Sequence, residues 1–176
     1  IDLPTLMHEG LLTPEELASS YQSTPYLCEF GRLSDERLSL LRKASERVPS
    51  DERTKIDAFI KENEHISDFC FFMAKKEANG QKSWWEFDKG IDIDPDILFM
   101  HKFIQYKFFR QWMLVKSYAA ERGIEIIGDL PMYPDLDSAD VYAEPKLFQL
   151  DENNRPEAVA GVPPDYFSSD GQLWGN

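Results

Sequence analysis

The amino-acid sequence predicts an α/β fold whose first two-thirds are mainly α-helical. Before residue 97, apolar residues recur at helical spacing in several capped segments. A longer periodic segment over residues 97–120 is followed by Gly123 and an apolar run at 124–127, which is typical of a helix, a tight turn and a buried parallel strand. Residues 130–176 show little regular patterning, and so long an irregular stretch is usually functional or part of a larger fold.

Composition excludes several classes of function. The chain of 176 residues carries a net charge of −13, which argues against nucleic-acid partners and anionic membrane surfaces and otherwise favours solubility. No apolar run approaches the roughly 20 residues of a membrane span. The sequence contains no His-x-x-x-His pair, CxxC pair, GxGxxG, Walker loop or GxSxG, and we predict no metal site. It begins at Ile1 without Met and closes on a loop, so we expect an internal piece of a larger protein.

The first helix is predicted from its cap. Thr13 is placed as the N-cap, Pro14 as the first helical residue and Glu16 as the third, which together make a capping box. Residues 21–32 are expected to be an irregular connector. Ser34 is then expected to cap a second helix.

The next segments are assigned from periodicity. Ser50 is expected to begin one long helix that Asn79-Gly80 ends. Residues 81–96 are expected to be a linker whose Trp84-Trp85 pair is either a plug between helices or a sugar-stacking surface. The helix over 97–120 is expected to bury one apolar stripe. That stripe consists of Ile104, Phe108, Trp112, Val115 and Ala119, widened by Phe109 and Met113.

Three carboxylate or hydroxyl residues are candidates for ligand contact. Asp129 follows the apolar run, and the carboxyl ends of parallel strands form the active-site face of α/β folds. Its carboxylate could hydrogen-bond a substrate hydroxyl or cap the next turn. Asp137 and Ser138 open a short helix near 137–143, with Asp137 as the expected N-cap and Asp140 at the third position. Both residues are also candidates for substrate contact.

The closing loop is the third candidate site. Tyr166 and Phe167 are adjacent, so an extended chain cannot bury both rings, and an exposed ring stacks well on the apolar face of a pyranose. Gln172, Trp174 and Asn176 would add hydrogen bonds and a further ring. The alternative is a structural role for all of these aromatic rings.

These residues carry a resemblance to a known family. The run "GIEIIGDLPMYPDLDSADVYAEPKLFQLDENNRPEAVAGVPPDYFSSDGQLWGN" over 123–176 resembles the amylomaltases, the 4-alpha-glucanotransferases. Their pattern runs GDxPIF, DSADVWA, P-LF-LD and VAGVPPDYFS-TGQ-WGNP. The preceding helix and the segment "LMHEGLLTPEEL" also resemble family segments. The sequence departs from the pattern at 132–135 and at Tyr142, where the family usually has Trp.

The resemblance implies a fold and an activity. It implies a fragment of a (β/α)8 TIM barrel with a mainly α-helical insertion over residues 1–96, and a partial barrel over 97–176 with a strand ending at Asp129. It implies cytoplasmic transfer of α-1,4-glucan segments between malto-oligosaccharides with retention of configuration. The family's nucleophile and general acid lie beyond its WGNP motif, so the resemblance implies that this chain supplies substrate contacts only. The implied partners are malto-oligosaccharides or α-glucan and the rest of the barrel, and the resemblance implies no cofactor.

The resemblance also implies residue roles. The Asp of the family's GDxP motif, which contacts the sugar next to the scissile bond, corresponds to Asp129. The family's aromatic loop beside the acceptor cleft corresponds to Tyr166 and Phe167, with Trp174 following. Two alternatives are a stand-alone α-glucan-binding module without catalysis, and a helical interaction protein whose acidity serves solubility.

Overall fold

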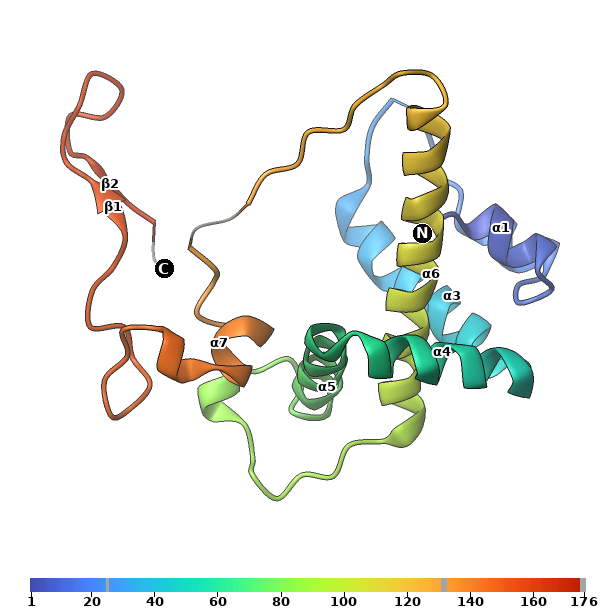
Figure 1. The fold of residues 1–176 in the computed structure, drawn as a ribbon, viewed down its shortest axis with the longest axis horizontal. Helices are drawn as coiled ribbons and strands as arrows, with labels where there is room; N and C mark the ends of the chain where they lie inside the picture. The colour runs from blue at the N-terminus through green and yellow to red at the C-terminus, as the bar shows by residue number, and fades with distance from the viewer. Residues whose placement is uncertain (25, 131–132, 175–176) are drawn as a thin grey trace. The chain divides into compact units, whose positions relative to one another are not determined.

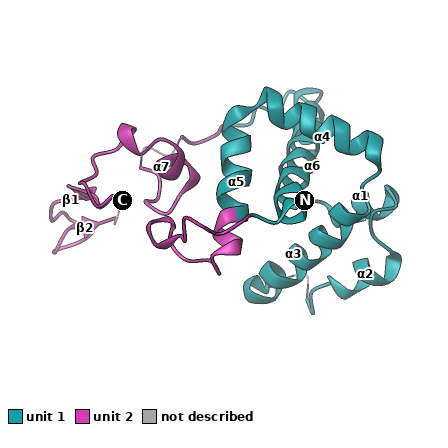
Figure 2. Ribbon diagram, turned by 90° about the horizontal axis from the view of Figure 1, so that it is seen from below, with its two compact units in different colours: residues 1–74, 93–126 teal, residues 75–92, 127–176 magenta. Residues whose placement is uncertain are grey.

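The computed structural model describes residues 1–24, 26–130 and 133–174, which form two compact units (Figure 2). The first unit comprises Ile1–Ala74 and Ile93–Ile126, and the second comprises Lys75–Asp92 and Ile127–Asn176. Each unit is therefore built from two segments that are separate in the sequence. This division differs from the expected boundary after residue 96. The assignment of residues 1–96 as an insertion remains a prediction.

The first unit is helical and has its own core. Its helices, drawn in Figure 1, are α1 (Leu3–His8), α2 (Pro14–Ser19), α3 (Phe30–Glu46), α4 (Ser50–Glu62), the larger part of α5 (Glu64–Ala78) and α6 (Pro95–Ala120). Helix α6 packs against α3 and α4. Buried apolar side chains from these helices form one cluster, which confirms the expected helical character of this part of the chain.

The capping box that the sequence predicts is present at the start of α2. The Glu16 backbone N–H donates to Thr13 Oγ1 at 3.2 Å, and the Thr13 backbone N–H donates to Glu16 Oε2 at 3.0 Å. The Glu16 carboxylate also accepts two hydrogen bonds from the Arg47 guanidinium, at 2.6 and 2.9 Å. The same guanidinium donates to the Leu11 carbonyl. Glu16 therefore joins the start of α2 to the end of α3.

This contact predicts a pH dependence of stability. The Arg47 guanidinium, with the Thr13 N–H, lowers the pKa of Glu16 from an ordinary 4.5 to about 2. Because the folded pKa is the lower one, the stabilisation is fully present above the unfolded pKa and is lost as pH falls from about 4.5 toward 2. Urea unfolding of Glu16→Gln and the unsubstituted chain should differ at neutral pH and converge near about pH 2. Glu62→Gln, at the exposed end of α4, is the control and should match the unsubstituted chain in stability at both pH values. An equal loss of stability in Glu16→Gln at both pH values would contradict the assignment.

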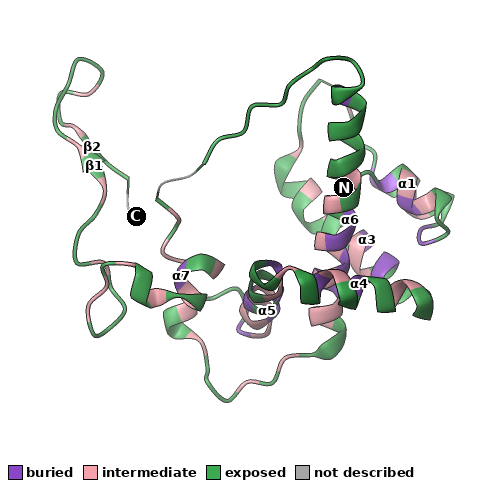
Figure 3. Ribbon diagram, in the orientation of Figure 1, coloured by how far each residue is buried: buried purple, intermediate pink, exposed green. Residues whose placement is uncertain are grey.

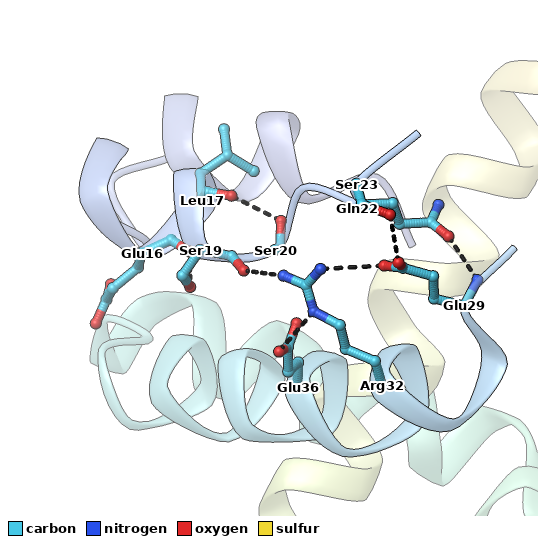
Figure 4. Close-up of polar contacts among 9 residues, drawn as sticks. All are labelled: Glu16, Leu17, Ser19, Ser20, Gln22, Ser23, Glu29, Arg32 and Glu36. Carbon is cyan, nitrogen blue, oxygen red and sulfur yellow. Dashed lines mark hydrogen bonds and ion pairs between the residues drawn. The ribbon is translucent and has the colours of Figure 1, made fainter. Parts of the chain in front are cut away.

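Helix α3 begins at Phe30, with Glu29 at the N-cap position that was expected for Ser34, because polar contacts of Glu29 and Arg32 hold its first turn (Figure 4). The Arg32 guanidinium donates to Glu29 Oε2 at 3.0 Å, to Glu36 Oε1 at 2.8 Å and to the Ser19 carbonyl at 3.1 Å. Glu29 additionally accepts from the Ser23 hydroxyl at 2.5 Å. These contacts fix the turn before Ser34 in a helical conformation, and no local cap predicts them.

The expected long helix from Ser50 is two helices, α4 and α5, separated at Asn63. The Asn63 side-chain amide donates to the Phe59 backbone carbonyl at 2.7 Å. The Asn63 backbone carbonyl accepts from the Ile66 and Ser67 N–H groups. Asn63 thus satisfies the backbone groups on both sides of the break. Helix α5 ends before Asn79-Gly80, as predicted, and Gly80 has a φ of +65°.

Helix α6 is apolar on more than one face and buries only part of the expected stripe, namely Ala119, with Ile104 and Phe109 partly buried against the core. Asp94 caps it, and its first half buries Met100, Phe103 and Tyr106 against α3 and α4. Several members of the expected stripe lie in the second half of the helix and are exposed (Figure 3). These are Phe108, Trp112, Met113 and Val115. A helix that is apolar all round is normally covered all round, so this half has a surface suited to further packing.

A buried ion triad also lies on α6. The Lys107 side chain is 4% exposed, and its ammonium contacts Glu9 Oε2 at 2.7 Å and Glu52 Oε1 at 2.6 Å. Glu9 caps the C-terminus of α1 and Glu52 lies in the first turn of α4. One lysine therefore holds three elements of the first unit together.

The second unit has little regular structure, as predicted. Its elements are the end of α5, the 3₁₀ turns η1 (Trp84–Glu86) and η2 (Pro145–Leu147), the helix α7 (Ala139–Ala143), and the strands β1 (Gly161–Val162) and β2 (Gln172–Leu173). A turn at 151–155 is closed by an isolated bridge between Leu150 and Pro156. None of the helices in the described residues is long and apolar enough to cross a membrane.

The strand expected over residues 124–127 is not formed. These residues lie in an extended, exposed segment, in which Ile127 is 94% exposed. A parallel strand exists only when its backbone groups pair with neighbouring strands. The only sheet in the described part of the chain is the short β1–β2 pair, which supplies no such neighbour. The apolar run indicates a segment that favours burial between neighbouring strands. The described residues supply no such strands, so the segment stays exposed.

Candidate functional site

The closing loop is carried by a tight hairpin. Strands β1 and β2 pair antiparallel, with Gly161 opposite Leu173 and Val162 opposite Gln172. A Cβ at Gly161 would collide with the Gln172 carbonyl oxygen, so only glycine allows this close pairing. Gly171 has a φ of +73° and closes the loop before β2. The hairpin thereby projects residues 163–171 away from the paired strands.

The tip of this hairpin presents two aromatic rings. The Asp165 carboxylate accepts from the backbone N–H groups of Phe167 and Ser168, at 2.9 and 2.8 Å, which fixes the turn. Tyr166 is 98% exposed and Phe167 89% exposed. Their ring centroids lie 5.7 Å apart with perpendicular planes. Neither ring is buried in the core of the unit. The hydrogen bonds of the turn therefore hold two aromatic side chains that point into solvent.

Trp174 and Gln172 form a second group at the base of the hairpin. The Trp174 indole N–H donates to Gln172 Oε1 at 3.0 Å, and the Trp174 backbone N–H donates to the Ala160 carbonyl at 2.9 Å. The Trp174 ring also lies 6.0 Å from the ring of Tyr133. The structure therefore brings these two predicted residues together. Asn176, which belongs to the same prediction, lies outside the described residues.

Asp137 and Ser138 make contacts within the second unit. The Asp137 carboxylate pairs with the Lys76 ammonium and accepts from the Trp84 backbone N–H at 3.1 Å. The expected N-cap at Asp137 is wrong: Ser138 is the N-cap of α7, and its hydroxyl accepts from the Val141 N–H. The cap moves by one residue because the Asp137 carboxylate is engaged by a lysine 61 positions earlier.

Sequence reasoning missed the residues that anchor this motif. The Trp84 indole donates to the Leu136 carbonyl at 2.7 Å, and its ring contacts Tyr142 at 5.9 Å. Tyr142 also contacts Phe87. The Trp pair was the available signal, and the plug interpretation holds for Trp84, which is partly buried. Trp85 is 46% exposed and does not fit it.

Asp129 stands apart from the other candidates. It lies in the exposed segment after residue 123. Within the described part of the chain, no hydrogen bond or ring contact joins it to Tyr166, Phe167 or Trp174. The carboxylate is available to solvent and to a ligand.

The chemistry of these groups suits a neutral polar ligand with apolar faces. The second unit offers outward rings, a side-chain amide and carboxylates, together with a pocket of about 440 Å³ lined partly by Tyr133, Val141 and Phe148. Aromatic rings pack on the C–H face of a sugar, while amides and carboxylates bind hydroxyls. Among the described residues, no group of three or more His, Cys, Asp or Glu side chains is placed to hold a metal.

Comparison with known proteins agrees with this chemistry. The 4-alpha-glucanotransferase family model matches residues 1–176. A 4-alpha-glucanotransferase of Aquifex aeolicus is 45% identical over 69% of this chain and 27% of its own length. One from Synechocystis is 36% identical over 100% of this chain and 38% of its own length. A solved amylomaltase from Streptococcus agalactiae in complex with acarbose has a TM-score of 0.90 and 34% identity, covering 100% of this chain and 39% of that chain.

These matches define a class of protein, because each matched protein is named as a 4-alpha-glucanotransferase or an amylomaltase. The chain belongs to the 4-alpha-glucanotransferase family. It spans between about a quarter and two-fifths of the length of these relatives.

Proposed function

We propose that this chain is part of an enzyme that transfers α-1,4-glucan segments between malto-oligosaccharides by a retaining double displacement. The observation that carries the proposal is the match of the family model along residues 1–176, supported by the similarity to an amylomaltase solved with acarbose. In such a reaction a carboxylate attacks the anomeric carbon, a carboxylic acid protonates the departing sugar, and the acceptor hydroxyl then displaces the enzyme carboxylate. Both of these carboxyl groups lie outside this chain in the proposal, in a cytoplasmic parent enzyme.

The contribution of this chain is to hold sugar. In the proposal, Asp129 accepts a hydrogen bond from a hydroxyl of the sugar beside the scissile bond. Tyr166 and Phe167 stack on the acceptor, and Trp174 with Gln172 and Asn176 extends that surface. Two further residues, Asp137 and Ser138, remain in the proposed binding set, but their side chains already make intramolecular hydrogen bonds, so we expect smaller effects from them.

The fold of the parent is part of the same proposal. We place residues 97–176 in a (β/α)8 barrel and residues 1–96 in a helical insertion. The exposed apolar half of α6 supports this, because Phe108, Trp112 and Val115 form a surface of the kind that barrel helices bury. The apolar run at 124–127 supports it also, since it would pair as a strand beside barrel neighbours.

Maltotriose disproportionation tests the activity. The intact protein that contains this chain, incubated with maltotriose alone, should release glucose together with maltopentaose and longer products. Hydrolysis to glucose and maltose without longer products would contradict a transferase. The absence of any reaction would overturn the proposal.

A stand-alone α-glucan-binding module is the second candidate, favoured by the two outward rings at the hairpin tip. Calorimetric titration of the 176-residue chain with maltoheptaose separates the two. Binding by the chain alone, together with an inactive intact protein, would favour the module over the enzyme.

A further inference from the structure

We infer that a pocket beside Trp85 is a further sugar-binding site, formed by residues different from those of the hairpin tip. Its volume is about 540 Å³, and it lies within the second unit. Its lining consists of Trp85, Leu136, Asn153, Asn154 and Arg155. We call it the Trp85 pocket. The inference rests on the proposed function for the identity of the sugar, an α-1,4-linked glucan.

The Trp85 ring is a prepared stacking surface. It is 46% exposed, so burial in a core does not account for its presence. It lies edge-on to Trp84, at 5.9 Å between centroids. Trp84 is fixed in turn by its indole hydrogen bond to Leu136 and by its backbone bond to Asp137. A ring whose support is hydrogen-bonded loses little freedom when a ligand stacks on it.

The rest of the polar lining comes from a hydrogen-bonded turn over residues 151–155. The Asp151 carboxylate accepts from the Asn153 and Arg155 backbone N–H groups at 2.8 and 2.9 Å, and the Asp151 N–H donates to the Arg155 carbonyl at 2.8 Å. Asn154 adopts a φ of +59°, which this turn requires and which asparagine tolerates. The backbone of the turn is thus bonded internally, and its amide and guanidinium groups face outward.

This combination selects a neutral sugar. An indole ring packs on the C–H face of a pyranose, an asparagine amide both donates to and accepts from its hydroxyls, and a guanidinium donates to them. Within the residues that the structure describes, the Arg155 guanidinium donates no hydrogen bond and forms no salt bridge, although it interacts at longer range with the Asp151 carboxylate of the same turn. The net charge of −13 disfavours a polyanionic ligand. A neutral α-glucan chain offers hydroxyls and C–H faces and carries no negative charge.

The test uses native gels that contain amylose, in which a glucan-binding protein is retarded. For the intact protein, Trp85→Ala should reduce the retardation, and the ratio of KM for amylose to KM for maltotriose should rise by about three- to tenfold. Trp85→Phe keeps a ring and should restore most of the retardation. Asn154→Gly combined with Arg155→Ala, which leaves Trp85 and its support in place, should reproduce the loss. Glu152→Ala, on the same turn but outside the lining, is the matched control.

The outcomes separate the two proposals. Unchanged retardation and an unchanged KM ratio in Trp85→Ala and in the turn variant, with normal maltotriose disproportionation, would overturn the Trp85 pocket alone. Equal losses in Glu152→Ala would overturn it too, because the effect would then not depend on the lining. No disproportionation by the unsubstituted protein would overturn the proposed function, and loss of amylose retardation in both lining variants would still support the pocket.

Discussion

Lys107→Ala is expected to lower the free energy of unfolding by about 3 kcal/mol, near the lower end of the cost of breaking a buried ion pair. The lysine ammonium is almost fully buried and bonds Glu9 and Glu52 at 2.7 and 2.6 Å. Removing it takes away the ammonium that both carboxylates contact and leaves the Arg110 guanidinium as the nearby positive charge. The cost stays near the low end because the Glu9 side chain is 40% exposed and can regain water.

Lys102→Ala is the matched control, because it lies on the same helix. Its ammonium pairs with Asp57 at 3.0 Å, but the Asp57 side chain is 57% exposed. A pair of this kind contributes at most about 1 kcal/mol. Urea denaturation of both variants measures the difference. Equal destabilisation by the two substitutions would contradict the special role of the Lys107 triad.

The parts of the fold that the sequence predicts well are those determined by neighbours in the chain. The capping box of Thr13 and Glu16 and the stop at Gly123 both depend on contacts within five residues. The errors lie where distant residues decide. Arg32 orders the connector through Ser19, and Lys76 draws Asp137 away from the helix cap.

The apolar residues show a different limit. Periodicity correctly assigns α6 as a helix, but a helix with apolar residues on more than one face does not reveal which stripe its neighbours cover. Phe103 and Tyr106 are buried in this chain, while Phe108 and Trp112 are exposed. The run at 124–127 likewise reports a tendency to be buried, and strand formation needs partners that the described residues lack.

The exposure of the hairpin tip follows from the sequence, while its role as a binding site stays a prediction. Composition and adjacency indicate that Tyr166 and Phe167 cannot both be buried, and the structure exposes both. Pattern alone could not reveal that Trp84 anchors Asp137 and Leu136, because that contact spans more than fifty residues. The pattern also could not predict that Trp84 anchors the motif while Trp85 is exposed.

Tyr166→Ala in the intact enzyme is expected to raise KM for the acceptor sugar by roughly tenfold, the equivalent of about 1.4 kcal/mol of lost ring contact. The fold should be retained, because a side chain that is 98% exposed contributes little burial, and such surface changes usually shift stability by less than about 0.5 kcal/mol. Phe167→Ala should act in the same direction, since the two rings contact each other at 5.7 Å. The measurement is the rate of transfer from maltotriose at increasing glucose concentration.

Because the two rings are in contact, their effects should not add. Tyr166→Ala removes the edge-on support of the Phe167 ring, so the double variant should lose less than the sum of the two single losses. Leu147→Ala, which removes another highly exposed apolar side chain of the second unit, serves as the control and should leave the acceptor KM unchanged. If Tyr166→Ala transferred glucan with unchanged kinetics, the hairpin tip would not be the acceptor surface, and the outward rings would need another ligand.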